Sequence, residues 1–200
     1  MSDETHAPAE VLISEKDLRT RVGELGSELA ALYADGPEPP LLVSVLKGST
    51  MFLADLMRAM PIDLAVDFMS ISSYGHAEHS GVVRIVKDLE ENIEGRDLLI
   101  VEDIVDTGLT LNYLRRTLGD RGPRSLRAVT LLDKLARRIV PVELEFSGFE
   151  IPDVFVVGYG LDFQGLYRNT AEILAIKDLA RLANERHLLV DATFGPRSHA

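Results

Sequence analysis

The sequence has no cysteine and no tryptophan among its 200 residues. Without cysteine the chain has no disulfide, no thiolate metal site and no cysteine nucleophile, which is typical of proteins from a reducing compartment. It also lacks an apolar run near the roughly 18 residues that a membrane-spanning helix needs. The first ten residues, MSDETHAPAE, are acidic and lack the basic and apolar regions of a signal peptide. We therefore expect a soluble, cytoplasmic protein.

Positive charge is scarce. The 21 Lys and Arg residues are scattered and outnumbered by 32 Asp and Glu residues, which gives a formal net charge of −11. A nucleic-acid-binding surface needs a basic patch that neutralises phosphates. We therefore expect no nucleic-acid partner and no membrane partner, and look for small-molecule substrates instead.

The length and the hydrophobic content favour one well-formed domain. Hydrophobic residues make up 46% of the chain, and a chain of this size buries on the order of 70% of its unfolded surface. The sequence shows no internal repeat, no low-complexity stretch and no shift in composition. We predict a single domain over residues 1–200, with residues 1–15 and 192–200 loosely ordered.

Hydrophobic spacing predicts strands that alternate with helices. The predicted helices cover residues 17–33, 49–60 and 178–186, and another helix is opened by residues 106–108. The predicted strands cover residues 41–46, 64–71, 82–86, 98–101, 126–132, 154–157 and 173–176. Apolar strands that alternate with helices indicate an α/β fold whose mainly parallel sheet is covered on both faces. In such sheets ligands bind at the carboxyl ends of the strands, where the strand order switches.

The segment LLIVEDIVDTGLTL, residues 98–111, carries the strongest functional signal. A buried strand leads into Glu102 and Asp103, and a turn with Asp106 follows. Ionised carboxylates are costly to bury without partners, so this acidic pair indicates contact with water, a cation or sugar hydroxyls. The backbone N–H groups of the turn and the helix N-terminus suit a phosphate. An ordinary helix start, with Asp106 or Thr107 as the N-cap, would explain the turn but not the acidic pair.

Residues 101–110, VEDIVDTGLT, resemble the phosphoribosyl-pyrophosphate signature of the purine phosphoribosyltransferases. The likeness extends to four more segments, which are LKGS at 46–49, SYG at 73–75, LDK at 132–134 and GFEIPDVFVVGYGLD at 148–162. In order and spacing the chain resembles the hypoxanthine-guanine phosphoribosyltransferase family from about residue 41 to 168. This resemblance implies the type I phosphoribosyltransferase fold, with a mainly parallel central sheet flanked by helices, a flexible flap and a small base-binding hood.

The resemblance implies a purine salvage enzyme that joins hypoxanthine or guanine to phosphoribosyl pyrophosphate, giving IMP or GMP and pyrophosphate. Asp106 would be the general base that takes the proton of purine N7. Many relatives have Lys where this chain has Leu109, so the backbone of the turn must bind more of the 5′-phosphate. The implied phosphoribosyl-pyrophosphate site comprises Glu102, Asp103, Ile104, Val105, Asp106, Thr107, Gly108, Leu109, Thr110, Lys47, Gly48 and Arg168.

The same resemblance implies a purine site and a metal site. Lys134 would donate to the 6-oxo group, which favours 6-oxopurines over adenine because an ammonium group is only a donor. Phe155 would stack on the purine, Val156 would contact its edge through the backbone, and Asp162 would bind a second magnesium ion. The implied ligands of the Mg²⁺ cofactor are Glu102, Asp103 and Asp162. Taken singly, Lys134 and Arg168 also fit solvated surface charges, and Phe155 fits core packing.

Two further features follow from the resemblance. The bond between Leu46 and Lys47 is often cis in the family, and Ser73 and Tyr74 would belong to a flap that closes over the site and excludes water. His76 and His79 do not indicate a metal site, because Mg²⁺ prefers oxygen ligands. The family also implies a homodimer or homotetramer. Two alternative functions stay open, a phosphoribosyltransferase that prefers xanthine and a regulator of the same fold that senses phosphoribosyl pyrophosphate.

Overall fold

The computed structural model describes residues 8–74, 82–185 and 189. The chain divides into two compact units, a larger one over residues 19–153 and a smaller one made of residues 1–18 and 154–200. The prediction of a single domain over residues 1–200 stays a prediction.

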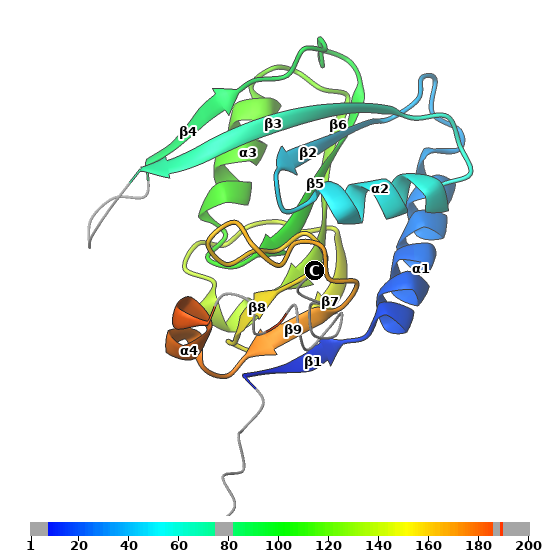
Figure 1. Cartoon of the computed structure of the whole chain (residues 1–200). Coiled ribbons are helices and arrows are strands. Elements are labelled where there is room, and N and C mark those ends of the chain that lie inside the picture. The colour runs from blue at the N-terminus through cyan, green and yellow to red at the C-terminus, as the bar shows by residue number, and fades with distance from the viewer. Residues whose placement is uncertain (1–7, 75–81, 186–188, 190–200) are drawn as a thin grey trace, which may run out of the picture. The chain divides into compact units, whose positions relative to one another are not determined.

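The larger unit is built on a six-stranded sheet (Figure 1). Its strands are β2 (Leu41–Leu46), β3 (Ala65–Tyr74), β4 (Val82–Lys87), β5 (Asp97–Val105), β6 (Ser125–Asp133) and β7 (Phe146–Glu150). Their order in the sheet is β4-β3-β2-β5-β6-β7. All neighbouring strands are parallel except β3 and β4, which form an antiparallel hairpin. The predicted α/β fold with a mainly parallel sheet is confirmed.

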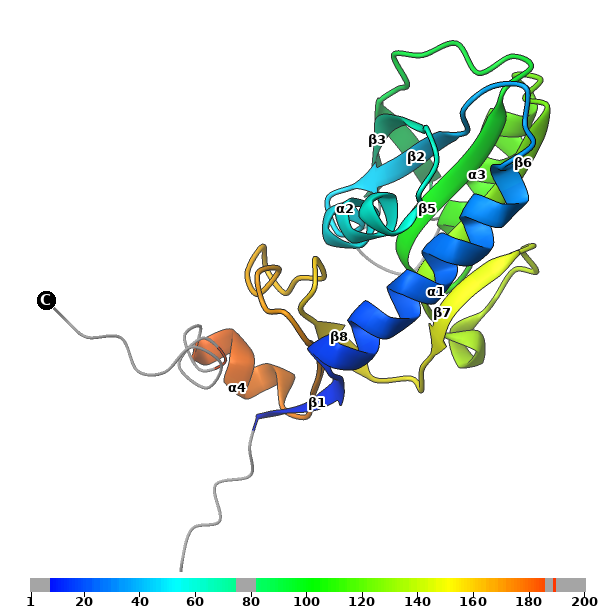
Figure 2. The same cartoon turned by 90° about the vertical axis from the view of Figure 1, so that its right-hand side faces the viewer.

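Helices cover both faces of this sheet. The helices are α1 (Glu15–Tyr33), α2 (Thr50–Ala59) and α3 (Leu109–Gly119), and a short 3-10 helix, η1, covers Leu135–Arg137. Figure 2 shows α1 and α2 on one face and α3 on the other. Because side chains alternate along a strand, β2 and β5 bury residues toward both helical layers. The core on the α3 side contains Leu41, Val43, Val45, Leu98, Ile100, Leu111, Leu114 and Leu118.

The apolar spacing that predicts this helix places Leu18, Val22, Leu25, Leu29 and Leu32 on one face of α1. Leu18, Val22, Leu25 and Leu29 are buried. Leu32 is 42% exposed, because it lies in the last turn of the helix. At the other end Ser14 caps the helix, since its Oγ accepts a hydrogen bond of 3.2 Å from the backbone N–H of Asp17.

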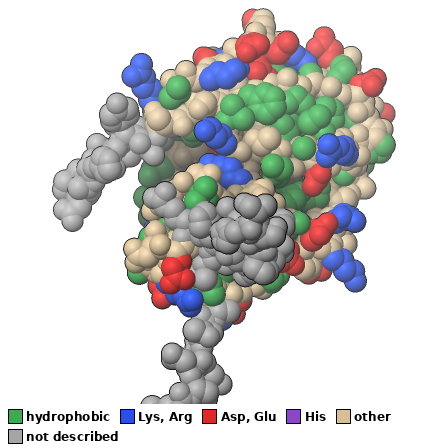
Figure 3. Space-filling view, viewed as in Figure 1, with side chains coloured by type: hydrophobic (Ala, Val, Ile, Leu, Met, Phe, Trp, Pro, Cys, Tyr) green, Lys and Arg blue, Asp and Glu red, His purple; other side chains and the backbone are tan. Residues whose placement is uncertain are grey.

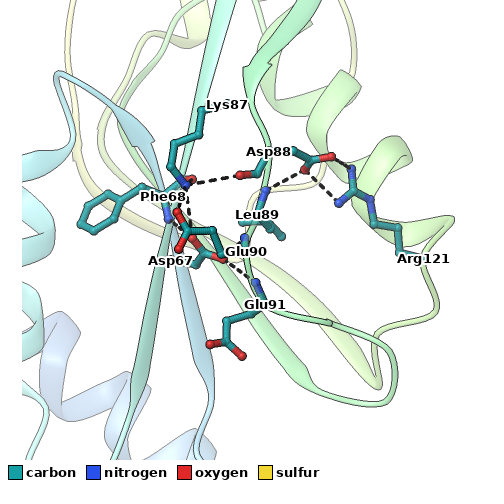
Figure 4. A network of polar contacts seen from close by, with 8 residues as sticks. All are labelled: Asp67, Phe68, Lys87, Asp88, Leu89, Glu90, Glu91 and Arg121. Atoms are coloured by element: carbon teal, nitrogen blue, oxygen red, sulfur yellow. Dashed lines mark hydrogen bonds and ion pairs between the residues drawn. The ribbon is translucent and has the colours of Figure 1, made fainter.

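A buried carboxylate holds the chain that follows β4 (Figure 4). Asp67 on β3 accepts hydrogen bonds from the backbone N–H groups of Phe68, Glu90 and Glu91, at 2.7, 2.7 and 3.0 Å. Lys87 Nζ lies 3.8 Å from Asp67 Oδ1. Burial alone would raise the pKa of Asp67, but the three backbone donors and Lys87 together hold that pKa below its ordinary value. Asp67 therefore stabilises the turn as a carboxylate.

The smaller unit contains a three-stranded antiparallel sheet in the order β1-β9-β8. Its strands are β1 (Ala9–Ile13), β8 (Phe155–Val157) and β9 (Ile173–Ile176), and α4 (Leu179–Asn184) follows β9. Val157, Leu174, Ile176, Leu182 and Tyr167 form its core. Loose order over residues 1–15 is wrong for β1, because Ala9–Ile13 pairs with β9. Residues 1–7 and 192–200 lie outside the described residues.

Besides β1, the elements β5, β7 and α3 differ from the sequence-based expectation. Strand β7 was not predicted because only two of its five residues are apolar and none of the five is fully buried. Strand β5 runs to Val105 rather than ending at Val101, so the acidic pair lies within the strand. Helix α3 begins at Leu109 with Gly108 as its N-cap, so neither Asp106 nor Thr107 occupies the N-cap position.

Candidate active site

The predicted site residues of the larger unit gather where the strand order of the sheet reverses. β2 and β5 are parallel neighbours, and from them the chain moves outward in opposite directions, to β3 and to β6. At such a switch point the loops after the two strands separate and leave a crevice for ligands. Lys47 and Gly48 follow β2, and the turn from Asp106 follows β5. The fold therefore brings together two motifs that lie far apart in the sequence.

The loop after β2 lies directly against Asp103, the second residue of the acidic pair. A Cβ atom on Gly48 would lie 1.6 Å from Asp103 Oδ2, so any other residue here would displace the Asp103 side chain. The peptide bond between Leu46 and Lys47 is cis, as the family resemblance implies. Ser49 turns its hydroxyl inward, where its Oγ lies 2.7 Å from Ser44 Oγ. The loop backbone thus lies against the carboxylate of Asp103.

Glu102 and Asp103 are adjacent residues near the carboxyl end of β5. Glu102 is only 5% exposed, and its Oε1 has no hydrogen-bond partner among the described residues. Burial, together with the nearby charge of Asp103, raises the pKa of Glu102 well above its ordinary value. Asp103 Oδ1 accepts a hydrogen bond of 2.8 Å from the backbone N–H of Ile104. A buried carboxylate oxygen without a donor is suited to a ligand that brings a hydroxyl group or a cation.

These carboxylates fit a magnesium ion. Mg²⁺ prefers oxygen ligands and is usually held by one or two carboxylates together with oxygens of the substrate. The buried Glu102 Oε1, which lacks a donor, and the neighbouring Asp103 supply such a pair. Within residues 8–74, 82–185 and 189, no group of three His, Cys, Asp or Glu residues could hold a metal by itself. A magnesium ion at this pair would take its other oxygens from water and substrate.

The turn after β5 forms a small cavity at the N-terminus of α3. Its volume is about 230 Å³, a little below the roughly 300–1,000 Å³ of drug-sized sites. Gly108 has a φ of 84°, and a Cβ there would lie 2.7 Å from Arg138 Cδ, so both conformation and space require glycine. Gly108, the N-cap of α3, has no side chain to cap the helix, and Thr107 Oγ1 accepts a hydrogen bond of 3.4 Å from the backbone N–H of Leu109. The cavity is lined by Glu102, Ile104, Val105, Asp106, Thr107, Gly108, Thr110 and Leu111.

The segment after β6 contacts this turn through residues that the sequence did not single out. Arg137 Nε lies 3.1 Å from Asp106 Oδ1. Arg138 forms an ion pair with Asp133, and its Nε donates to the backbone oxygen of Asp106 at 3.4 Å. The only sequence signal was a pair of arginines soon after Lys134, which reads equally well as a solvated surface.

Lys134 is fixed at the end of β6. Its backbone N–H donates to Val105 O at 3.0 Å, and the residue as a whole is only 6% exposed. The alternative of a fully solvated lysine is therefore wrong. A buried ammonium group beside the turn can donate hydrogen bonds to a ligand and cannot accept them.

The smaller unit contains the other four predicted residues. Phe155 is 38% exposed and packs edge to face against Phe163, with 5.7 Å between the ring centroids. Val156 is buried in β8. Arg168 forms an ion pair of 2.7 Å with Asp162 and donates to the backbone oxygen of Gly160 at 2.6 Å. Two residues that the sequence treated as separate ligands are thus partners of each other.

The predicted flap is described only in part. Ser73 and Tyr74 end strand β3, where their backbones pair with β4. Residues 75–81, with His76 and His79, lie outside the described residues. The roles expected for this flap stay predictions.

The surface charges agree with the scattered pattern in the sequence. On the face shown in Figure 3, Lys and Arg side chains lie singly or in small groups among acidic side chains. In the part of the chain that the structure describes, no helix has both the length and the apolar character to cross a membrane.

Comparisons with known proteins agree with this geometry. The family model described as "Phosphoribosyl transferase domain" matches residues 18–164. The hypoxanthine-guanine phosphoribosyltransferase of Bacillus subtilis is 48% identical over 173 residues, which cover 86% of this chain and 95% of that protein. The hypoxanthine phosphoribosyltransferase of Salmonella typhimurium is 50% identical over 161 residues, which cover 80% of this chain and 90% of that protein. A crystal structure of a hypoxanthine phosphoribosyltransferase from Staphylococcus aureus has a TM-score of 0.81 and 45% identity, and the match covers 88% of this chain and 96% of that one.

Proposed function

The chain belongs to the phosphoribosyl transferase family, and on this basis we propose that it transfers the 5-phosphoribosyl group of phosphoribosyl pyrophosphate to hypoxanthine or guanine. The products are IMP or GMP and pyrophosphate, so the reaction salvages free purine bases. The relatives named above carry this activity in their names. They do not favour the xanthine-preferring enzyme or the regulator.

One observation carries the proposal. At the switch point of the sheet, the glycine loop after β2 lies against Asp103 of the acidic pair, and β5 leads into a cavity at the N-terminus of α3. The loop and the cavity offer backbone N–H groups to phosphates, and the carboxylates offer oxygens to ribose hydroxyls. A phosphorylated sugar matches both kinds of group at once.

The residues of the larger unit then have distinct roles. Glu102 and Asp103 accept hydrogen bonds from the ribose hydroxyls and hold magnesium, while residues 106–110 bind the 5′-phosphate. Lys47 and Gly48 bind the pyrophosphate. Bound magnesium supplies positive charge that stabilises the leaving pyrophosphate. Asp106 accepts the proton of purine N7 while N9 bonds to C1 of the ribose.

Selectivity for 6-oxopurines follows from Lys134. Its buried ammonium group donates a hydrogen bond to the 6-oxo oxygen, whereas the 6-amino group of adenine would leave a buried cation facing another donor. Adenine is therefore expected to be a poor substrate.

The remaining roles are proposals that rest on the family resemblance. Phe155 stacks on the purine, Val156 contacts its edge, and Asp162 binds a second magnesium ion. Arg168 reaches the pyrophosphate, and Ser73 and Tyr74 belong to a flap that excludes water. The half-exposed ring of Phe155 supports the stacking role, because one face of the side chain can still be covered by a ligand. We further propose a cytoplasmic homodimer or homotetramer that binds neither nucleic acid nor membranes.

The test is an assay of nucleotide formation from phosphoribosyl pyrophosphate and magnesium with hypoxanthine, guanine, xanthine and adenine offered separately. We expect turnover with hypoxanthine or guanine, none with adenine, and loss of turnover after chelation of the metal that added magnesium restores. A dominant rate with xanthine would favour the alternative enzyme. Binding of phosphoribosyl pyrophosphate without turnover of any base would favour the regulator.

A further inference from the structure

The segment over residues 134–140 is hydrogen-bonded at both of its ends to the end of β5 and the turn that follows it. The backbone N–H of Lys134 donates to Val105 O at 3.0 Å. The backbone N–H groups of Ile139 and Val140 both donate to Thr107 O, at 3.1 and 3.3 Å. These bonds fix η1 beside Asp106 independently of any side chain, so the position of Arg137 relative to the turn is determined by the backbone.

Arg137 lies between two carboxylates. Its Nε is 3.1 Å from Asp106 Oδ1, and its NH1 group is 3.5 Å from Asp153 Oδ1. Its own side chain is 49% exposed, so the guanidinium group keeps contact with water. Arg137 is therefore not part of the hydrophobic core, and its ion pair with Asp106 indicates a role in orienting that carboxylate.

The two oxygens of Asp106 have different surroundings. The side chain is 39% exposed, yet Oδ1 is buried and accepts no hydrogen bond from the described residues. The exposure therefore belongs to the rest of the carboxyl group, including Oδ2. The ion pair with Arg137 is the attraction that opposes rotation of the carboxylate about its Cβ–Cγ bond.

We propose that Arg137 is a positioning residue that holds Asp106 by Oδ1 and so presents Oδ2 to the purine. This inference rests on the proposed function. In the transfer step the N7–H bond breaks and an Oδ2–H bond forms, while N9 bonds to C1 and pyrophosphate leaves with the electron pair of the C1–O bond. Asp106 becomes neutral in this step, and Asp153 continues to balance the charge of Arg137.

Four variants test the proposal. Arg137→Met removes the guanidinium group but keeps an unbranched side chain, and Arg137→Lys keeps a positive charge. Asp106→Asn removes the base, and Arg58→Met is the matched control because Arg58 forms a 3.1 Å ion pair with Asp55 on α2. Steady-state kinetics with hypoxanthine and phosphoribosyl pyrophosphate are compared with the thermal midpoint of each variant.

We expect Arg137→Met to lower kcat about tenfold, because misplacing a general base forfeits part of its contribution. Its KM for phosphoribosyl pyrophosphate and its Tm should stay at the wild-type values. Arg137→Lys should recover part of kcat, and Arg58→Met should match the wild type. In the Asp106→Asn background the same change at Arg137 should have little effect, because the base that it positions is gone.

Three results would overturn the proposal. One is an active wild type whose kcat is unchanged by Arg137→Met, and another is an equal fold-loss in both backgrounds. The third is a change in KM for phosphoribosyl pyrophosphate without a change in kcat. If Arg137→Met did not fold, the kcat of Arg137→Lys and of Asp153→Asn would be compared in the wild-type and Asp106→Asn backgrounds instead. A wild type without turnover of any base would instead refute the proposed function itself.

Discussion

Replacing the buried carboxylate of Asp67 by the amide in Asp67→Asn should cost about 3 kcal/mol of unfolding free energy. This loss can be worked out from the hydrogen bonds that Asp67 accepts in the structure. An asparagine oxygen can take the place of Oδ2 and accept from Glu90 and Glu91, but the amide NH2 then faces the backbone N–H of Phe68 and the ammonium of Lys87. One donor left unsatisfied costs at least about 1 kcal/mol, and each of the two remaining bonds loses about 1 kcal/mol of charge assistance, which together give about 3 kcal/mol.

The assay is thermal and urea-induced unfolding across a range of pH. At neutral pH we expect Tm to fall by about 9 °C, since 1 kcal/mol shifts Tm by about 2–4 °C in a chain of this size. The native pKa of Asp67 is below its ordinary value, so ionised Asp67 adds stability above its unfolded-state pKa. That stability is lost as the pH falls through the native pKa, and the difference between wild type and variant should shrink there.

The control is Asp55→Asn, which changes an exposed carboxylate on α2 and should alter stability by less than about 0.5 kcal/mol. A loss for Asp67→Asn as small as that of the control would refute the reasoning. A large loss that stayed constant down to strongly acidic pH would also refute it, because the effect would then not depend on the charge.

Three further predictions concern the candidate site. Gly48→Ala should raise the KM for phosphoribosyl pyrophosphate about tenfold or more, because its Cβ would collide with Asp103, whereas Gly23→Ala on α1 meets nothing within 4 Å and should leave the kinetics unchanged. Glu102→Gln should raise Tm at neutral pH while lowering turnover, because a buried carboxyl group whose pKa is raised destabilises the fold once the pH exceeds its unfolded-state pKa; a lower Tm would contradict this. Lys134→Met should reduce kcat/KM for hypoxanthine far more than the affinity for phosphoribosyl pyrophosphate, and an equal loss of both would argue against a purine contact.

The sequence was sufficient to predict the elements that bury continuous apolar runs. The bounds of β2 and β9 agree residue for residue with the prediction, because both strands consist almost wholly of buried apolar residues. Strand β7 was not predicted, because it is an edge strand that pairs only with β6 and contains few apolar residues. Strand β1 was missed because its partner, β9, lies at the other end of the chain.

In the candidate site, too, features set by neighbouring residues could be predicted, whereas contacts between residues far apart in the sequence could not. The turn over residues 106–108 could be recognised because its glycine and its place after a strand are local features. Arg137 could not, since its contact with Asp106 depends on how β6 pairs with β5 and on the backbone bonds to Thr107. The pairing of Asp162 with Arg168 depends likewise on a loop whose path the sequence does not specify.

The central claim is that this chain transfers a phosphoribosyl group with Asp106 as the base. The most direct test compares Asp106→Asn with the wild type, measuring both the rate of IMP formation from hypoxanthine and the Kd for phosphoribosyl pyrophosphate. The account predicts that the rate falls at least about 100-fold while the Kd stays at its wild-type value. Unchanged turnover in Asp106→Asn would contradict it.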